Sequence, residues 1–209
     1  MIGLSSCLIR ERLMKIYALD RFPSDSVQSV LDIGGNVSVF STQARFKFPS
    51  ARIVAVEPDP ANAKAFRTNV DGLNIEVIEA GLGRGKPLEC RNPGQRNATL
   101  VYAETQKEGG VRSLTLPQMF AEAKLNPLQT FIKCDCEGAE LTLIDDPEAE
   151  KILLACVGWG FEIHSRDGIA RFGRWMVDKF SRNMVITFMH CTHTGFGLAM
   201  RRDIWERTL

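Results

Sequence analysis

Charged side chains alternate at the end of an apolar run in the second half of the chain. Lys133, Asp135 and Glu137 occupy every second position there, with Cys134 and Cys136 between them. Because side chains alternate between the two faces of a strand, the charged groups should emerge together while the cysteines point the other way. Such a row at the carboxyl end of a strand is well placed to bind a ligand or to move a proton. A purely structural alternative is that Lys133 neutralises Asp135 in a partly buried pair.

A second segment with an acidic residue, VLDIGGNVS over residues 30–38, predicts a buried strand that turns sharply into a helix. Its apolar run contains Asp32 and closes on Gly34 and Gly35. Glycine lets the backbone approach a ligand, and the free N–H groups at the start of a helix face whatever binds there. Glu57 ends the next apolar run, at a distance that suits one helix and one returning strand. This arrangement is typical of sites for nucleotide-like cofactors.

Short apolar runs alternate with longer helical patterns along the chain, which indicates strands joined by crossover helices and hence a parallel sheet. Thr115 and Gln118 have the spacing of a capping box, so a helix should begin there. Thr194-Gly195 indicates a hairpin, so one strand near the C-terminus should run antiparallel. The expected strands cover residues 30–33, 52–57, 75–80, 130–135, 155–164, 184–190 and 196–201, and the expected helices cover 8–20, 37–48, 61–69, 115–125 and 169–180.

Length and composition fit a single domain over residues 1–209, because 44% hydrophobic content can fill a real core. Within it, residues 1–24 should form an N-terminal helix or cap. Residues 84–112, where proline and glycine loosen the pattern, should form an inserted flap or hairpin. The formal net charge of +1 gives no global field that would favour nucleic acid or an anionic membrane.

The six cysteines show no paired metal-type spacing, and we interpret them as reduced thiols of a cytoplasmic protein. The first residues lack the pattern of a secretion signal, and no stretch approaches the roughly eighteen apolar residues of a membrane span. His190 and His193, with Cys191, could resemble metal ligands, but the sequence offers no fourth ligand nearby. We therefore expect no metal, no membrane and no nucleic-acid partner, and the oligomeric state stays open.

The pairing of DIGGN over residues 32–36 with KCDCEGAE over residues 133–140 resembles the FkbM family of S-adenosylmethionine-dependent methyltransferases. Residues 56–58, 81–83, 113–116 and 161–164 match in the family's order. The resemblance implies an α/β, Rossmann-like class I methyltransferase fold: a seven-stranded, mostly parallel sheet with one antiparallel strand near the C-terminus and helices on both faces. Two departures are Gly35, where the family commonly has alanine, and Ser38, where it has another glycine.

The resemblance also implies S-adenosylmethionine as cofactor. Asp32, Gly34 and Gly35 would form the loop beneath its methionine portion, and Glu57 would accept hydrogen bonds from the ribose hydroxyls. The turn at Gly81-Leu82 would border the adenine. The residues expected to bind the cofactor are Asp32, Gly34, Gly35, Asn36, Glu57, Pro58, Gly81, Leu82 and Asp135, the last lying near the methionine amino group or the acceptor.

The implied reaction is methyl transfer, most often to a hydroxyl oxygen, and we expect a small-molecule acceptor such as a sugar or a secondary metabolite. Positioning of donor and acceptor should dominate, and a general base would remove the hydroxyl proton. The candidate bases are Glu137, His164 and Asp135, of which we favour His164 or Glu137. Asp135 should be committed to Lys133 or to the cofactor, and Glu162 could orient the site from the adjacent strand.

Two other interpretations share this fold. A nicotinamide-dependent oxidoreductase would also carry glycines followed by an acid, but its G-x-G-x-x-G fingerprint is absent from residues 34–39, GGNVSV. A non-catalytic module could keep the fold and the cofactor site without activity, with Ser38 as the sign of a relaxed pocket. Cofactor titrations and a methyl-transfer assay discriminate among the three.

Overall fold

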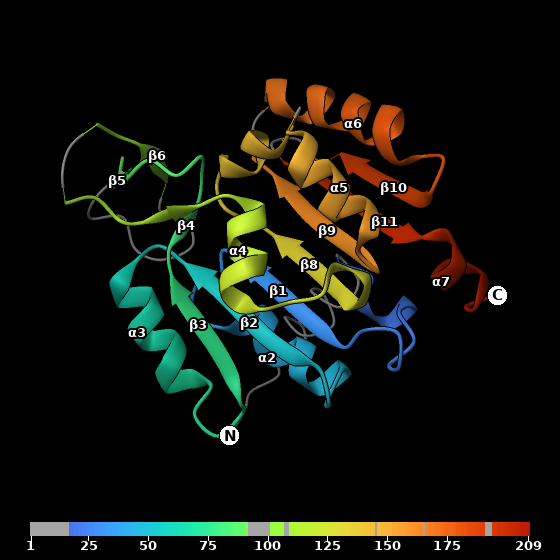
Figure 1. Ribbon diagram of the computed structural model, residues 1–209, viewed down its shortest axis with the longest axis horizontal. Coiled ribbons are helices and arrows are strands. Elements are labelled where there is room, and N and C mark those ends of the chain that lie inside the picture. Colours follow the sequence, from blue (N-terminus) through green and yellow to red (C-terminus); the bar gives the residue numbers. More distant parts are fainter. Residues whose placement is uncertain (1–16, 92–100, 107–108, 145, 165, 191–193) are drawn as a thin grey trace.

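A computed structural model describes residues 17–91, 101–106, 109–144, 146–164, 166–190 and 194–209. Its centre is a seven-stranded sheet in the order β10-β11-β9-β8-β1-β2-β3 (Figure 1). β11 pairs antiparallel with both β10 and β9, and the other neighbours in the sheet are parallel. This confirms the sheet expected from the sequence. The strands are β1 Ser29–Ile33, β2 Arg52–Glu57, β3 Ile75–Glu79, β8 Thr130–Cys134, β9 Gly158–Ile163, β10 Met184–His190 and β11 Gly195–Arg201.

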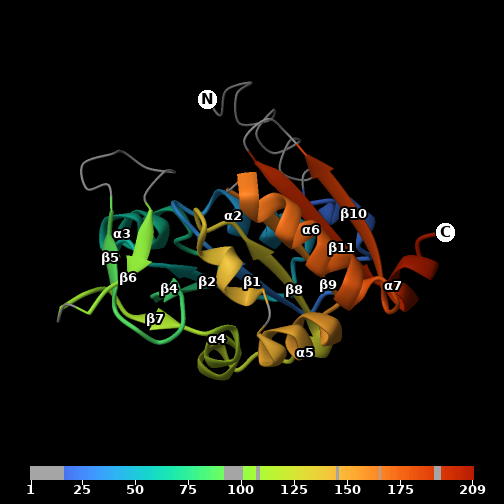
Figure 2. The same cartoon turned by 90° about the horizontal axis from the view of Figure 1, so that it is seen from above.

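Helices cover both faces of this sheet, as Figure 2 shows. Side chains of α4, α5 and α6 pack in one apolar cluster, and those of α2 and α7 pack in a second cluster across the sheet. The alternation along β1 explains this, because Leu31 and Ile33 belong to the first cluster and Val30 to the second. The helices are α2 Val39–Lys47, α3 Pro60–Asn69, α4 Leu116–Ala123, α5 Pro147–Ala155, α6 Arg166–Phe180 and α7 Arg202–Glu206, with 3-10 turns η1 Leu19–Arg21, η2 Pro127–Gln129 and η3 Ala139–Leu143.

Two short strand pairs lie between β3 and α4. β4 (Gly81–Leu82) pairs in parallel with β7 (Ser113–Leu114). β5 (Leu88–Cys90) pairs antiparallel with β6 (Tyr102–Glu104), within the segment where the sequence indicated a flap or hairpin. The predicted capping box of α4 is also present, since Thr115 accepts from the Gln118 amide and Gln118 accepts from the Thr115 amide.

Some expected boundaries are wrong. The strand expected from residue 155 begins only at Gly158, because Ala155 is the last residue of α5. That helix was not predicted, although Asp146 caps it by accepting from the Glu148 and Ala149 amides. Most of the helix expected over residues 8–20, with the proposed cap, lies outside the described residues. None of the described helices is both long and apolar enough to cross a bilayer.

Candidate active site

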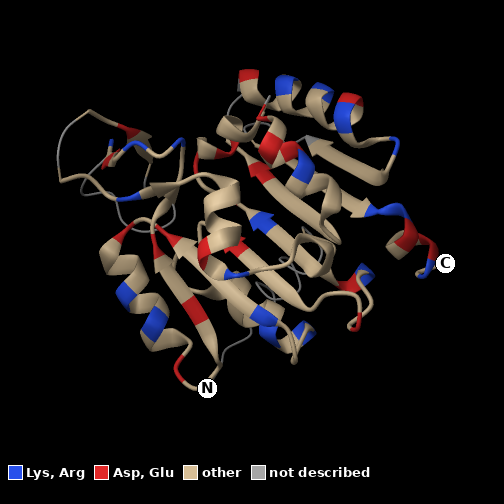
Figure 3. Cartoon of the chain, in the orientation of Figure 1, with Lys and Arg blue, Asp and Glu red and all other residues tan. Residues whose placement is uncertain are grey.

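A cavity of about 410 Å³ opens at the carboxyl ends of β1, β2 and β8. Parallel α/β sheets bind their ligands at this edge. Figure 3 shows acidic positions near the arrowhead ends of neighbouring strands on the same side of the sheet. The predicted site residues that line the cavity are Gly34, Gly35, Asn36, Glu57, Pro58, Gly81, Leu82, Lys133, Asp135 and Glu137.

The bend after β1 is tied to both neighbouring strands. The Gly34 and Gly35 amides both donate to the carbonyl of Val56, at 2.9 and 3.1 Å. Gly34 has a φ of +79°, and a Cβ added to it would lie only 1.8 Å from the carbonyl oxygen of Asp135. The expected reason for this glycine, close approach to a ligand, therefore needs correction. Gly34 is required because the ends of β1 and β8 touch here.

Asp32 lies behind this bend and does not line the cavity. Its carboxylate is fully buried, accepts from the hydroxyl of Ser41 at 2.6 Å and lies 3.2 Å from the ammonium of Lys133. Asp32 is therefore not placed to contact the methionine end of a cofactor directly, contrary to the expectation from the sequence. Its effect on a ligand is indirect, through the shape of the bend.

Lys133 pairs more closely with Asp32 than with Asp135, which lies 3.7 Å from its ammonium. The ammonium also donates to the carbonyl of Gly34 at 2.6 Å. Burial alone would lower the pKa of Lys133, but the charges of Asp32 and Asp135 outweigh it and raise the pKa. Lys133 therefore stays charged and holds the bend through the carbonyl of Gly34, and its expected catalytic role stays a prediction.

Ser38 begins α2 with a φ of +84°, in the left-handed region that favours glycine. It is buried, and its side chain makes no capping hydrogen bond. We predict that Ser38→Gly raises the free energy of unfolding by up to about 1 kcal/mol, because it removes a left-handed cost of about 1–2 kcal/mol and adds a smaller entropic cost. Urea denaturation measures the change. Ser38→Ala keeps the Cβ and should gain nothing, so equal stability of the two variants would contradict the prediction.

Glu57 is the last residue of β2, and its buried carboxylate lines the cavity. One oxygen accepts from the amide of Asn36 at 2.7 Å, and the other accepts from the amide of Asp59 at 3.0 Å and the side chain of Asn62 at 3.4 Å. Burial raises its pKa, and these hydrogen bonds oppose the rise. A carboxylate offers about four acceptor positions, so Glu57 retains capacity for a donor from a ligand.

The cavity residues that escaped sequence reasoning include three with polar side-chain groups, Tyr17, Asn62 and Tyr102. Asn62 lies three residues after Asp59, which caps the start of α3. Recognition of this cap in the sequence would have placed Asn62 in the first turn of the helix, beside Glu57. Tyr102 comes from β6 and its hydroxyl donates to Asp59 at 3.1 Å. Its segment carries no periodic pattern, so the sequence held no comparable signal.

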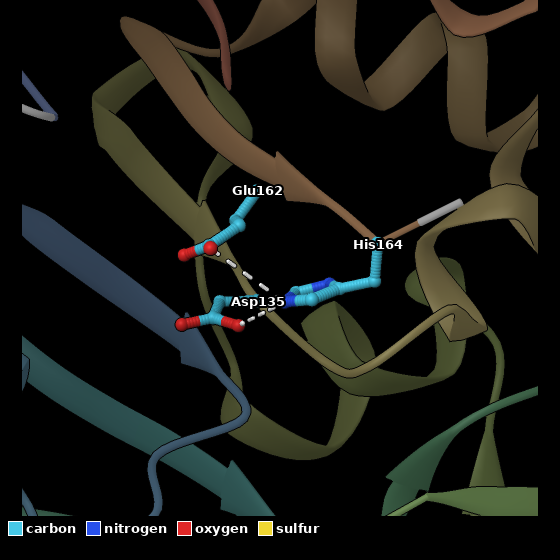
Figure 4. Close-up of side chains that lie close together, drawn as sticks. All are labelled: Asp135, Glu162 and His164. Carbon is cyan, nitrogen blue, oxygen red and sulfur yellow. Dashed lines mark ion pairs between the residues drawn. The ribbon is translucent and has the colours of Figure 1, made fainter. Parts of the chain in front are cut away.

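Four carboxylates surround His164, the residue that follows β9. Nδ1 lies 3.3 Å from Glu140, and Nε2 lies 3.5 to 3.8 Å from the other three carboxylates. Two of these, with the ring, are shown in Figure 4. The four acids are Asp135, Glu137, Glu140 and Glu162.

These carboxylates disfavour His164 as the general base. Burial alone would lower the pKa of His164, but the hydrogen bond and charge of Glu140, with the other carboxylates, raise it to about 9. In this arrangement the ring holds a proton at neutral pH and has no lone pair to accept another. Burial and the charge of Asp135 raise the pKa of Glu162 to about 7.

Some earlier expectations fall outside the described residues. Cys191 and His193 are among these, and the side chain of His190 is not described, so the structure does not test whether they approach one another. Cys134, Cys136 and Cys156 are thiols, as the sequence predicted, and Cys7 also lies outside the described residues. The sulfur atoms of Cys134 and Cys136 lie 3.4 Å apart, on the same side of the chain.

The sheet order and the cavity at the strand ends define a Rossmann-like, class I methyltransferase fold. The crystal structure of methyltransferase FkbM from Methylobacillus flagellatus KT superposes with a TM-score of 0.53 at 15% identity, covering 83% of this chain and 44% of that chain. A precorrin-6y C5,15-methyltransferase from Geobacter metallireducens GS-15 superposes with a TM-score of 0.51 at 13% identity, covering 91% and 86%. At these identities the two structures support the fold alone.

Sequence comparison identifies the family. The model of the methyltransferase FkbM domain matches residues 32–183, and the chain belongs to this family. "Methyltransferase 1" of Beauveria bassiana (strain ARSEF 2860) is 37% identical over 73 residues, which are 34% of this chain and 28% of that protein. The chain thus matches less than half the length of both this relative and the FkbM crystal structure.

Proposed function

We propose that the protein transfers the methyl group of S-adenosylmethionine to a hydroxyl oxygen of a small molecule, such as a sugar or a secondary metabolite. The observation that carries the proposal is Glu57, a buried carboxylate at the end of β2 that lines the same cavity as the glycine bend and as Asp135. The cavity's volume of about 410 Å³ lies within the range of roughly 300–1,000 Å³ typical of small-molecule sites.

The residues present fit this cofactor. Glu57 would accept hydrogen bonds from the ribose hydroxyls, while Pro58 and Leu82 offer apolar surface for the adenine. Asn36 lines the cavity, and its side-chain oxygen is buried with no hydrogen-bond partner among the described residues. A buried acceptor without a partner is costly, which favours a ligand that donates to it. When bound, S-adenosylmethionine supplies an electrophilic methyl group on a sulfonium.

The chain's own residues have two tasks in the reaction. The first is to hold the acceptor oxygen in line with the methyl group, for which effective molarities are worth roughly 7–11 kcal/mol. The second is to remove the hydroxyl proton. Glu137 lines the cavity, and its carboxylate lies 3.8 Å from Nε2 of His164. Asp135 is closer to Lys133 and to His164, so we assign the base to Glu137.

Glu57→Ala is expected to weaken S-adenosylmethionine binding about 10- to 100-fold, because a hydrogen bond to a charged group is worth about 1.5–3 kcal/mol. Isothermal titration calorimetry measures the affinity. The matched control is Glu79→Gln, at the position opposite Glu57 on β3, where the exposed side chain pairs with Arg67. Equal affinities of Glu57→Ala and the wild type would remove the basis of the proposed cofactor site.

A methyl-transfer assay with a panel of hydroxylated sugars and secondary metabolites tests the reaction itself. We expect S-adenosylhomocysteine to form together with a methyl ether, both detected by mass spectrometry. Binding of S-adenosylmethionine without transfer to any acceptor would favour the non-catalytic module. Titration with NADH is expected to give no binding, and binding of NADH in place of S-adenosylmethionine would favour an oxidoreductase.

A further inference from the structure

The ends of β8 and β9 bring two carboxylates and an imidazole together. The two strands are parallel with Cys134 opposite Phe161, so the next residues, Asp135 and Glu162, are also neighbours. His164 follows β9 directly. One ligand atom from each of Asp135, Glu162 and His164 lies within 4.8 Å of the others, and Figure 4 shows the three side chains converging.

The separations within this group suit a shared ion better than direct hydrogen bonds. Nε2 of His164 lies 3.5 Å from Asp135 and 3.7 Å from Glu162. Hydrogen bonds from nitrogen to oxygen usually span about 2.7–3.2 Å, so these two pairs are longer than ordinary hydrogen bonds. Neighbouring ligands of an octahedral cation lie about 3 Å apart when each is about 2.1 Å from the ion. The two distances from Nε2 of His164 would reach that spacing if the side chains each moved inward by a few tenths of an ångström.

Glu140 orients the imidazole for this role. Its carboxylate is fully buried and is held by the amides of Gly138 at 2.8 Å and His164 at 2.9 Å. It lies 3.3 Å from Nδ1 of His164, which leaves Nε2 facing Asp135 and Glu162. A carboxylate that accepts from the second ring nitrogen is the usual partner of a metal-binding histidine, because it fixes the tautomer.

The charge of the cluster also favours a cation. Four carboxylates lie within 3.8 Å of the ring nitrogens of His164. Among the described residues, Lys133 is also a cation near them, but it is shared between Asp135 and the closer Asp32. A bound dication would offset this negative charge and would take the place of the proton on Nε2 of His164.

We propose that Asp135, Glu162 and His164 form a binding site for a divalent cation of the Mn²⁺ type, with water completing its coordination. Two carboxylates with one imidazole suit a hard or borderline first-row ion. Asp135 lines the cavity, so the ion borders the acceptor space. The role of the ion in the reaction rests on the proposed function. The ion would bind the acceptor hydroxyl and lower its pKa, and the hydroxyl proton would pass to Glu137. The three ligands come from two different strands, so local spacing in the sequence did not indicate that they meet.

Mn²⁺ binding tests the site without reference to activity. The full chain is treated with EDTA, exchanged into metal-free buffer and titrated with Mn²⁺, with free Mn²⁺ followed by electron paramagnetic resonance. We expect one site in the wild type and affinity reduced at least about 10-fold in Glu162→Gln and in His164→Gln. The control is Glu148→Gln, an exposed acid on α5, which should bind as the wild type does.

Two results would overturn the site: no Mn²⁺ binding by the wild type at millimolar concentration, or equal binding by the wild type and both ligand variants. Thermal unfolding and S-adenosylmethionine affinity are measured on the same samples, so that a misfolded variant is recognised. If a variant is misfolded, Mn²⁺ binding by the wild type alone decides whether the site exists. A wild type that binds S-adenosylmethionine but not Mn²⁺ refutes this inference alone. One that binds Mn²⁺ but not S-adenosylmethionine refutes the proposed function alone, and methyl transfer unaffected by EDTA would refute the ion's role with the acceptor.

Discussion

Lys133→Met is expected to lower the free energy of unfolding by about 3–5 kcal/mol, because it leaves the buried carboxylate of Asp32 without its cation. Methionine is close to lysine in length, so little packing volume is lost. The substitution also removes the hydrogen bond to the carbonyl of Gly34, which should loosen the bend and weaken cofactor binding. Urea denaturation gives the loss of stability, and titration gives the loss of affinity.

A double-mutant cycle is the control for this result. Asp32→Asn alone also leaves a buried charge, here on Lys133, whereas the variant with both substitutions leaves none. We expect the double variant to lose less stability than the sum of the two single losses, which measures the coupling between the side chains. Additive losses, or a loss below about 1 kcal/mol for Lys133→Met, would show that the pair is unimportant for stability.

Glu137→Gln is expected to reduce the turnover of methyl transfer by about 10²–10⁴-fold, the usual contribution of a placed general base. Glutamine keeps the size of the side chain and cannot take a proton at neutral pH. Because Glu137 makes no hydrogen bond to the glycine bend or to Glu57 among the described contacts, S-adenosylmethionine affinity should stay unchanged. Single-turnover kinetics and calorimetry measure the two quantities separately.

The matched control for that experiment is again Glu148→Gln, whose exposed side chain pairs with Lys151 on the outside of α5. Its turnover should equal that of the wild type. Turnover that survives in Glu137→Gln at the wild-type level would remove this residue from the mechanism. A parallel loss of turnover and cofactor affinity would instead indicate that Glu137 supports the shape of the cavity.

The sequence predicted the sheet well because each buried strand is a short apolar run that ends at a charged or glycine residue. It also placed Glu57, Asp135 and Glu137 at strand ends, where the cavity lies. Local spacing was sufficient for these assignments, since a residue's position along its own strand fixes the edge of the sheet it reaches.

Partners across strands could not be predicted in the same way. The sequence indicated the pairing of Lys133 with Asp135, which lies 3.7 Å away, but not the closer pairing with Asp32, which lies opposite Lys133 in the register of β1 and β8. That register depends on the sheet order, which places two segments about a hundred residues apart side by side. The carboxylates that disfavour His164 as a general base also come from other segments, so the pattern of its own strand did not indicate them.

The absence of a side chain at Gly34 links two halves of the site. The carbonyl of Asp135 occupies the space where a Cβ would project, and the amide of Asp135 donates to Ile33 at 3.0 Å. The backbone of the glycine bend and the backbone of Asp135 are thus in direct contact, with no side chain between them. Because neither backbone can shift without displacing the other, we expect a ligand bound beside Gly34 to alter the position of Asp135.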